Sequence, residues 1–470
     1  MFSVRKSAAP NPSAYLNEGP ETVGMMTAVL GNGGSLDAAI REVASDGPPL
    51  SRRMFRSVTD DADTRVESDM RTSLRERLSA LPEGSSSYGM AMHMVISASD
   101  TRDTGERERM LKDASDIALQ GLREAGKSYS SSLNVPCMTV FGVGIMIPMV
   151  LMSVLPMLGM SGLFGSGNID PDTLTAVTVV IIPMFVMCVI SGIRGRNPFL
   201  RRNGLHMDML PLVPLVSSIP VFMVASRFCG SAVTAVCVSA IVTGACMLVS
   251  VVPEHVREDR RRRQDAMLQD AVFDMGNRLM SGMDFADAFL VSVSSRNICR
   301  GIADAFRNEC SVCRGDMETA ISNAVSPVSS STAEIFCRIY RVSLKDIRNA
   351  GKLALSLGRQ LKDQESVRKV IRSDLRSMTD TMFGTAAVFA PLVLGMSVSM
   401  LGPLSRVTEG FDTSGTSLIL SVYLVELCAL IAVLVSVLEG KESVRDVAGR
   451  FAFMLPISMA VFLVTTGVQL

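Results

Sequence analysis

The feature that most constrains the fold is a set of long apolar runs with almost no charged side chains, although 20% of the 470 residues are charged. About twenty apolar residues cross the hydrocarbon of a bilayer as a helix, because a helix satisfies its own backbone hydrogen bonds there. The runs therefore predict about seven membrane spans. These are residues 135–160, 174–193, 210–224, 232–252, 381–401, 418–438 and 451–470. Pro148, Pro183 and Pro391 lie inside three of them and predict kinks.

The charged residues gather in two blocks, 20–133 and 253–380, whose apolar residues recur at helical spacing. One stripe falls at i, i+3, i+4, i+7 and i+8, and we expect Pro327 to end its helix. The stripe consists of Met317, Ala320, Ile321, Ala324 and Val325. A second stripe consists of Met70, Leu74, Leu78 and Leu81. Both blocks are therefore predicted to be water-exposed helical bundles.

Short matches in the same order relate the two blocks. Residues 33–40, which start at Gly33, match 282–289, which start at Gly282, and Asp69-Met70 matches Asp316-Met317. A third match pairs Asp100, Arg102 and Gly105 with Asp346, Arg348 and Gly351. Ordered matches at a slowly shrinking offset indicate an internal duplication.

The chain is thus predicted to be an all-α integral membrane protein with two duplicated cytoplasmic helical-bundle domains. The expected order is a flexible N-terminal tail (1–19), a first bundle (20–133), a four-span cluster (134–252), a second bundle (253–380) and a three-span cluster (381–470). Residues 1–17 contain no apolar core of signal-peptide length, so we expect no cleavage there.

Basic residues in the short connections predict the orientation. Alternate connections carry Arg194, Arg196, Arg201 and Arg202; Arg257 and Arg260 to Arg263; and Lys441, Arg445 and Arg450. The connections between them hold one basic residue or none. By the positive-inside rule the basic connections are cytoplasmic. With seven spans, this places both bundles in the cytoplasm and the C-terminus outside the cell membrane.

Several motifs that resemble chemical sites are better explained structurally. Residues 121–128 satisfy the phosphate-loop pattern, but charged helix formers precede them instead of a buried strand, and the second block lacks the glycines and the lysine. Residues 31–35 are glycine-rich without a following Lys-Ser/Thr, which favours a turn between helices. Cys310-x-x-Cys313 has no second pair, and three histidines do not complete a zinc site. We therefore expect no catalytic residues, metal, cofactor or nucleic acid, and a protein that is not an enzyme.

Glu426 lies near the middle of the sixth predicted span. An ionised carboxylate at this depth costs a few kcal/mol, so it should face other helices or be protonated. A structural hydrogen bond and a proton-relay role are both open, and we favour the hydrogen bond.

At this point the sequence resembles a family. Residues 282–289, together with 349–357 and the charged helix that leads from them into a span, are similar to the type II secretion F domain. The two-copy arrangement resembles the archaeal branch that serves type IV pili and the archaellum, and also tight-adherence platforms. The first copy departs from the pattern, because Glu106 to Arg109 replace the apolar run 353–357.

The resemblance implies a non-enzymatic platform protein for type IV filament assembly and protein secretion. Its partners would be a separate hexameric ATPase, pilin-like subunits and the lipid bilayer, with a homodimer also compatible. The ATPase-facing candidates are exposed basic residues of the second block: Lys345, Arg348, Lys352 and Arg359. The alternative is a polytopic transporter or sensor with helical cytoplasmic domains. A transporter's repeats would lie in its spans, and no catalytic output motif marks a sensor.

Overall fold

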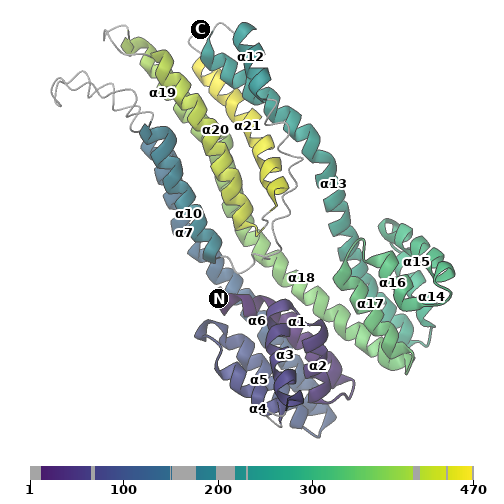
Figure 1. The fold of residues 1–470 in the computed structure, drawn as a ribbon. Coiled ribbons are helices and arrows are strands. Elements are labelled where there is room, and N and C mark those ends of the chain that lie inside the picture. Colours follow the sequence, from purple (N-terminus) through teal and green to yellow (C-terminus); the bar gives the residue numbers. More distant parts are fainter. Residues whose placement is uncertain are drawn as a thin grey trace, which may run out of the picture. The chain divides into compact units, whose positions relative to one another are not determined.

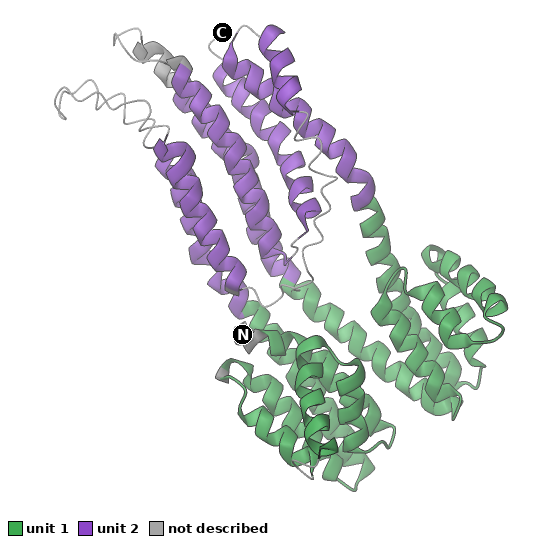
Figure 2. Cartoon of the chain, in the orientation of Figure 1, with its two compact units in different colours: residues 1–127, 256–371 green, residues 128–255, 372–470 purple. Residues whose placement is uncertain are grey.

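The computed structural model describes residues 12–64, 69–148, 150, 176–196, 218–228, 231–405, 413–440 and 443–467. Every regular element among these residues is a helix (Figure 1). The chain forms two compact units (Figure 2). We call Met1–Lys127 with Val256–Ile371 the bundle unit, and Ser128–His255 with Arg372–Leu470 the membrane unit.

The first half of the bundle unit is a six-helix bundle, here called bundle A. Its helices are α1 (Pro12–Gly31), α2 (Leu36–Asp46), α3 (Pro49–Asp63), α4 (Met70–Ser79), α5 (Ser86–Asp100, after the short 3₁₀ turn η1 at Glu83–Ser85) and α6 (Thr104–Ser132). Its core includes Phe55, Leu74, Tyr88 and Met92, all with fully buried side chains. Of the predicted second stripe, Leu74 and Leu78 are buried and Met70 and Leu81 pack partly buried against the core, although α4 ends before Leu81.

The second half, bundle B, also contains six helices. They are the C-terminal part of α13 (Ala232–Met280), α14 (Phe285–Ser294), α15 (Arg300–Val312, after the 3₁₀ turn η5 at Asn297–Cys299), α16 (Met317–Val325), α17 (Ser330–Ser343) and the first part of α18 (Ile347–Gly384). Phe289 is central to the core, with ring centroids 4.5 Å from Phe306 and 5.0 Å from Phe336. Four members of the predicted α16 stripe are buried and the helix ends two residues before Pro327, so this prediction is confirmed.

The membrane unit contains the apolar helices. They are α7 (Asn134–Phe141) with η2 (Gly142–Met146), η3 (Ala176–Ile181) with α10 (Ile182–Arg196), α12 (Ser218–Phe228), the start of α13, η6 (Thr385–Phe389) with α19 (Ala390–Ser405), α20 (Thr413–Leu438) and α21 (Val444–Gly467). Among the described residues, five helices are long and apolar enough to cross a membrane. They coincide with predicted spans two, four, five, six and seven. The chain is therefore an all-α, multi-pass membrane protein.

The first and third predicted spans extend outside the described residues. For the first, α7 and η2 cover the start, and for the third, only the short apolar helix α12 is described.

Each of the three prolines expected to cause kinks follows a π-helical segment. Pro148 lies two residues after η2, Pro183 two residues after η3, and Pro391 two residues after η6. A proline has no N–H, and its ring clashes with the carbonyl of residue i−4. Widening the preceding turn to i→i+5 bonding relieves that clash while the backbone stays paired inside the bilayer.

Three predicted boundaries are wrong. The tail assigned to residues 1–19 includes helix from Pro12 onward, because Tyr15 and Leu16 pack against the core of bundle A. The borders expected at 252/253 and 380/381 fall inside the continuous helices α13 and α18 (Figure 1). A change from apolar to charged composition marks a change of solvent, and a helix passes through it unbroken.

Candidate functional site

The four basic residues proposed to face an ATPase share one exposed side of bundle B. Lys345 lies in the turn before α18, and Arg348, Lys352 and Arg359 lie on α18. All four are exposed. Spacings of three, four and seven residues place them along one face of a helix. We call these four residues the basic stripe.

The opposite face of α18 fixes the direction of the basic stripe. Ala350, Leu353, Ala354 and Leu357 are buried in the core of bundle B. Since these residues alternate with the stripe at helical spacing, burying one face forces the other into water. The stripe is thus a rigidly presented row of cations.

Glycines allow α18 to approach α13 closely. A Cβ on Gly351 would lie 2.8 Å from both the Cγ atom and the backbone nitrogen of Met280, and one on Gly358 would lie 3.0 Å from the Cα atom of Phe273. From the other side, a Cβ on Gly276 would lie 2.9 Å from the backbone nitrogen of Leu355. Only Gly351 was singled out from the sequence. The signal for Gly358 was its seven-residue spacing from Gly351 within a helix, where glycine is otherwise unfavourable.

Asp346 starts α18 as its N-cap. One oxygen of its carboxylate accepts hydrogen bonds from the backbone N–H groups of Arg348 at 2.8 Å and Asn349 at 3.3 Å, and the other from the Asn349 side chain at 2.8 Å. A cap of this kind satisfies donors that have no partner within the helix. Asp346 therefore sets where α18 begins, and with it the register of the basic stripe.

Two of the three sequence matches between the blocks have the same local geometry in both bundles. Gly33 and Gly282 both adopt a left-handed conformation, with φ of 80° and 90°, in the turns before α2 and α14. Asp69 caps α4 by accepting from the N–H of Arg71 and the hydroxyl of Thr72, and Asp316 caps α16 by accepting from the N–H and the hydroxyl of Thr319. Gly33 lies within the glycine-rich stretch 31–35, which forms a turn between helices α1 and α2, as predicted.

The third match joins residues with different roles. Asp100 is the last residue of α5 and forms an ion pair with Arg71, whereas Asp346 is an N-cap. The residue in bundle A that caps the corresponding helix is Asp103, whose carboxylate accepts from the N–H of Gly105 at 3.0 Å. The correct offset here is therefore 243, which is also the offset between the ends of α5 and α17. Arg102 is exposed in the connection between α5 and α6.

Gly105 therefore does not allow a close helix contact of the kind that Gly351 allows between α18 and α13. A Cβ on Gly105 would have only the Asp103 carboxylate within 4 Å, at 3.7 Å. The tight helix contact made by Gly351 is thus specific to bundle B.

The segment that resembles a phosphate loop is helical throughout, inside α6. Its glycines are helix-packing positions: a Cβ on Gly121 would lie 2.5 Å from Ser87, and one on Gly126 would lie 2.4 Å from Ile371. Lys127 is exposed on the helix surface. Since a phosphate loop needs several N–H groups turned toward one point, a continuous helix excludes that use here.

Glu426 lies in α20 and is partly buried. Its Oε2 atom is buried and has no hydrogen-bond partner among the described residues. The structural hydrogen bond that we favoured is therefore not found at this oxygen within that part of the chain.

The cysteine pair lies at the end of α15, in a turn that contains two left-handed residues, Arg314 and Gly315. The Sγ atom of Cys310 lies 3.6 Å from the Sδ atom of Met317, and the Cys313 thiol contacts the Glu309 carboxylate at 3.8 Å. Burial raises the pKa of the Cys310 thiol, which disfavours the thiolate that metals bind. Among the described residues, no group of three or more His, Cys, Asp or Glu side chains is arranged to hold a metal.

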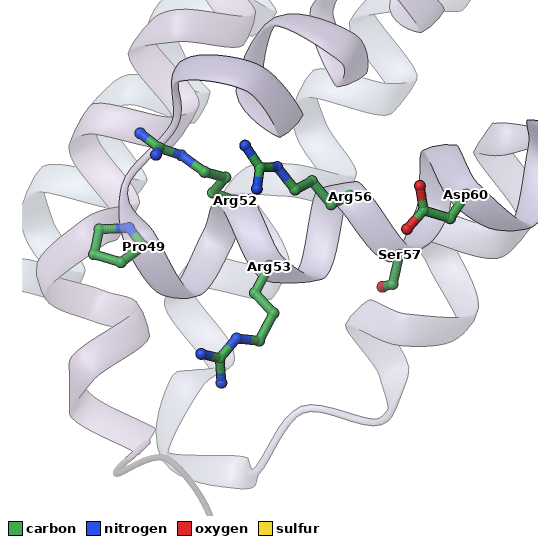
Figure 3. Close-up of a pocket in the computed structure, with 6 residues that line it drawn as sticks. All are labelled: Pro49, Arg52, Arg53, Arg56, Ser57 and Asp60. Atoms are coloured by element: carbon green, nitrogen blue, oxygen red, sulfur yellow. The ribbon is translucent and has the colours of Figure 1, made fainter.

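Residues of α3, three of them arginines, line a pocket (Figure 3). The guanidinium groups of Arg52 and Arg56 lie on one side of the helix, and Arg53 points to another. Arg52 donates from Nε to the carbonyl of Gly47 at 2.7 Å, and Arg56 to that of Ala44 at 2.8 Å. These two arginines therefore satisfy carbonyls at the C-terminal end of α2, a structural role.

No family model, curated protein or solved structure matches the chain.

Proposed function

We propose that the protein is the membrane platform of a type IV filament or type II secretion-like assembly machine, which couples a separate cytoplasmic ATPase to the insertion of pilin-like subunits. The observation that carries the proposal is that bundle B joins the membrane unit through two continuous helices, α13 and α18. A push on bundle B is thereby passed to two spans without an intervening loop. A machine that converts cytoplasmic motion into movement of membrane helices needs such a connection.

The proposed architecture has seven spans and duplicated bundles. Six helices occur in the same order in both bundles, with equivalent left-handed glycines and aspartate caps, which supports a duplication. The basic connections support a cytoplasmic location of both bundles and an external C-terminus in the cell membrane. The basic stripe is the proposed ATPase contact, and its charges would act mainly on the association rate and specificity.

The test is purification of the tagged full-length protein from its native cells after mild crosslinking, followed by mass spectrometry. We expect a hexameric secretion-type ATPase and pilin-like subunits among the partners, and loss of surface filaments or of secretion when the gene is deleted. Deletion that leaves filaments and secretion intact, with neither partner recovered, would contradict the proposal. Solute uptake that depends on the gene would favour the transporter alternative.

A further inference from the structure

The two bundles contact each other at several places that the proposed function does not use. The first is ionic: Nε of Arg338 on α17 lies 3.0 Å from a carboxylate oxygen of Glu42 on α2. The side chains are only 16% and 31% exposed, so water screens this pair less than a surface pair. Arg338 also lies 3.5 Å from Glu334 on its own helix. One arginine thus neutralises one carboxylate from each bundle.

Further charges of both signs surround this pair. Asp46 and Arg52 of bundle A lie close enough to act on Glu334, whose pKa is raised mainly by burial. Arg341, one turn beyond Arg338, instead forms a two-bond pair with Glu318 inside bundle B. The contact between α2 and α17 therefore alternates positive and negative groups, as expected of complementary surfaces.

The second contact is steric and lies on α1. A Cβ on Gly24 would lie 1.6 Å from the side-chain amide nitrogen of Gln360 on α18, so the amide occupies the space that a side chain would fill. The same amide donates a 2.7 Å hydrogen bond to the carbonyl of Pro20. That carbonyl lies in α1 and belongs to bundle A.

A third and a fourth contact extend the same surface. Ala28 of α1 is buried within the core of bundle B. Gly126 of α6 lies against Ile371, which follows Gln360 by eleven residues, or about three turns on one face of α18. Two helices of bundle A therefore pack along one side of α18.

From these contacts we infer that the two bundles are a single docked body, closed by the Arg338–Glu42 ion pair and by the fit of Gln360 over Gly24. Motion imposed on one bundle then moves the other bundle with it. The inference stands independently of the proposed function, because docking is measurable in the purified protein.

The experiment measures the distance between two spin labels in the full-length protein in lipid nanodiscs. The labels are attached to ketone-bearing unnatural amino acids that replace Met90 in bundle A and Val312 in bundle B, both exposed positions. The wild type should give one narrow distance distribution. Glu42→Arg and Arg338→Glu should each broaden it, and the charge-swapped double variant should restore it. Arg41→Glu, which breaks a pair inside bundle A with Asp63 at 2.9 Å, is the matched control and should leave it narrow.

A combined variant, Gly24→Leu with Arg338→Glu, disrupts both the steric contact with Gln360 and the ion pair with Glu42. We expect it to lose the narrow peak while the helix content by circular dichroism is unchanged. A distribution as narrow as the wild type in this variant, or a broad one in the wild type, would overturn the inference. Failure of the charge swap to restore the narrow peak would also overturn it.

Discussion

The hydroxyl of Tyr423 on α20 donates a hydrogen bond to the carbonyl of Gly144, which lies inside the π-helical segment η2. Tyr423 is fully buried. A π-helical turn disturbs the regular i→i−4 pairing, and in a bilayer no water is present to bond a displaced carbonyl. Tyr423 therefore links α20 to the π-helical segment η2 by a hydrogen bond.

We expect Tyr423→Phe to lower the thermal unfolding temperature of the protein in detergent. The free energy of unfolding should fall by about 1–3 kcal/mol, because the substitution leaves the buried carbonyl of Gly144 without its donor. Tyr340→Phe is the control, since Tyr340 packs its ring edge-on against Phe285 at 5.1 Å in bundle B. An unchanged unfolding temperature in Tyr423→Phe would show that Gly144 finds another donor.

A second prediction compares the glycines that the sequence paired. Gly351→Ala should destabilise the protein by about 1–3 kcal/mol, because its Cβ would overlap Met280 in a closely packed contact between α13 and α18. Gly105→Ala should be neutral or stabilising by up to about 1 kcal/mol, because its surroundings are open and alanine favours the helix. Denaturant unfolding of the two variants measures the difference. Equal losses would mean that the two glycines have equivalent roles after all.

A third prediction concerns how the stability of the fold depends on pH under acidic conditions. Hydrogen bonds from the Thr72 hydroxyl and the Arg71 N–H lower the pKa of Asp69, and the hydroxyl and N–H of Thr319 lower that of Asp316. A carboxyl with a lowered pKa in the folded state stabilises the fold above its ordinary pKa of about 4, and this contribution is lost as the pH falls through the lowered value.

Asparagine keeps a capping oxygen but does not titrate in this range. The double variant Asp69→Asn/Asp316→Asn should therefore lose less thermal stability than the wild type between about pH 5 and pH 2. Asp113→Asn, at an exposed position in the middle of α6, is the control and should follow the wild type. A double variant whose pH profile also follows the wild type would refute the role of the caps.

Residue patterns predicted what depends on short-range chemistry. The stripe from Ala320 to Val325 depends on periodicity and the turn at residues 31–35 on local backbone chemistry, and a sequence displays both. The caps at Asp69 and Asp316 and the left-handed Gly33 and Gly282 are also short-range features, but the sequence comparison recognised these residues only as matches between the two blocks. The five spans among the described residues follow from length and apolarity alone.

Contacts between distant helices could not be read in this way. Gly24 and Gln360 are 336 positions apart, and neither belongs to a motif. The pairing of Asp100 with Asp346 failed because a match of residue types does not distinguish an ion-paired helix end from an N-cap. Arg107 shows the same limit: it resembles a free surface charge but donates to the carbonyl of Thr101 at 3.0 Å.

A fourth prediction concerns the proposed topology. Single cysteines introduced at exposed positions of the bundles, Ser97→Cys and Ser330→Cys, should not react with a membrane-impermeant maleimide on intact cells, whereas a cysteine appended after Leu470 should. Labelling above the wild-type baseline is the measurement, and permeabilised cells are the control for reactivity. Reaction at Ser97→Cys or Ser330→Cys in intact cells would place that bundle outside and refute the proposed orientation.

The triple reversal Lys345→Glu/Arg348→Glu/Lys352→Glu in the full-length protein tests whether the basic stripe couples an ATPase to assembly. Arg109→Glu/Lys112→Glu on bundle A is the matched control, since both of its positions are exposed; Arg107 is unsuitable because of its bond to Thr101. The measurement is the amount of assembly ATPase recovered with each variant from native cells at about 0.1 M salt, where exposed charges are only partly screened. The triple variant should insert normally, recover little ATPase and make no filaments, while the control should recover wild-type amounts. Wild-type recovery and filaments in the triple variant, with loss of both in the control, would contradict this coupling.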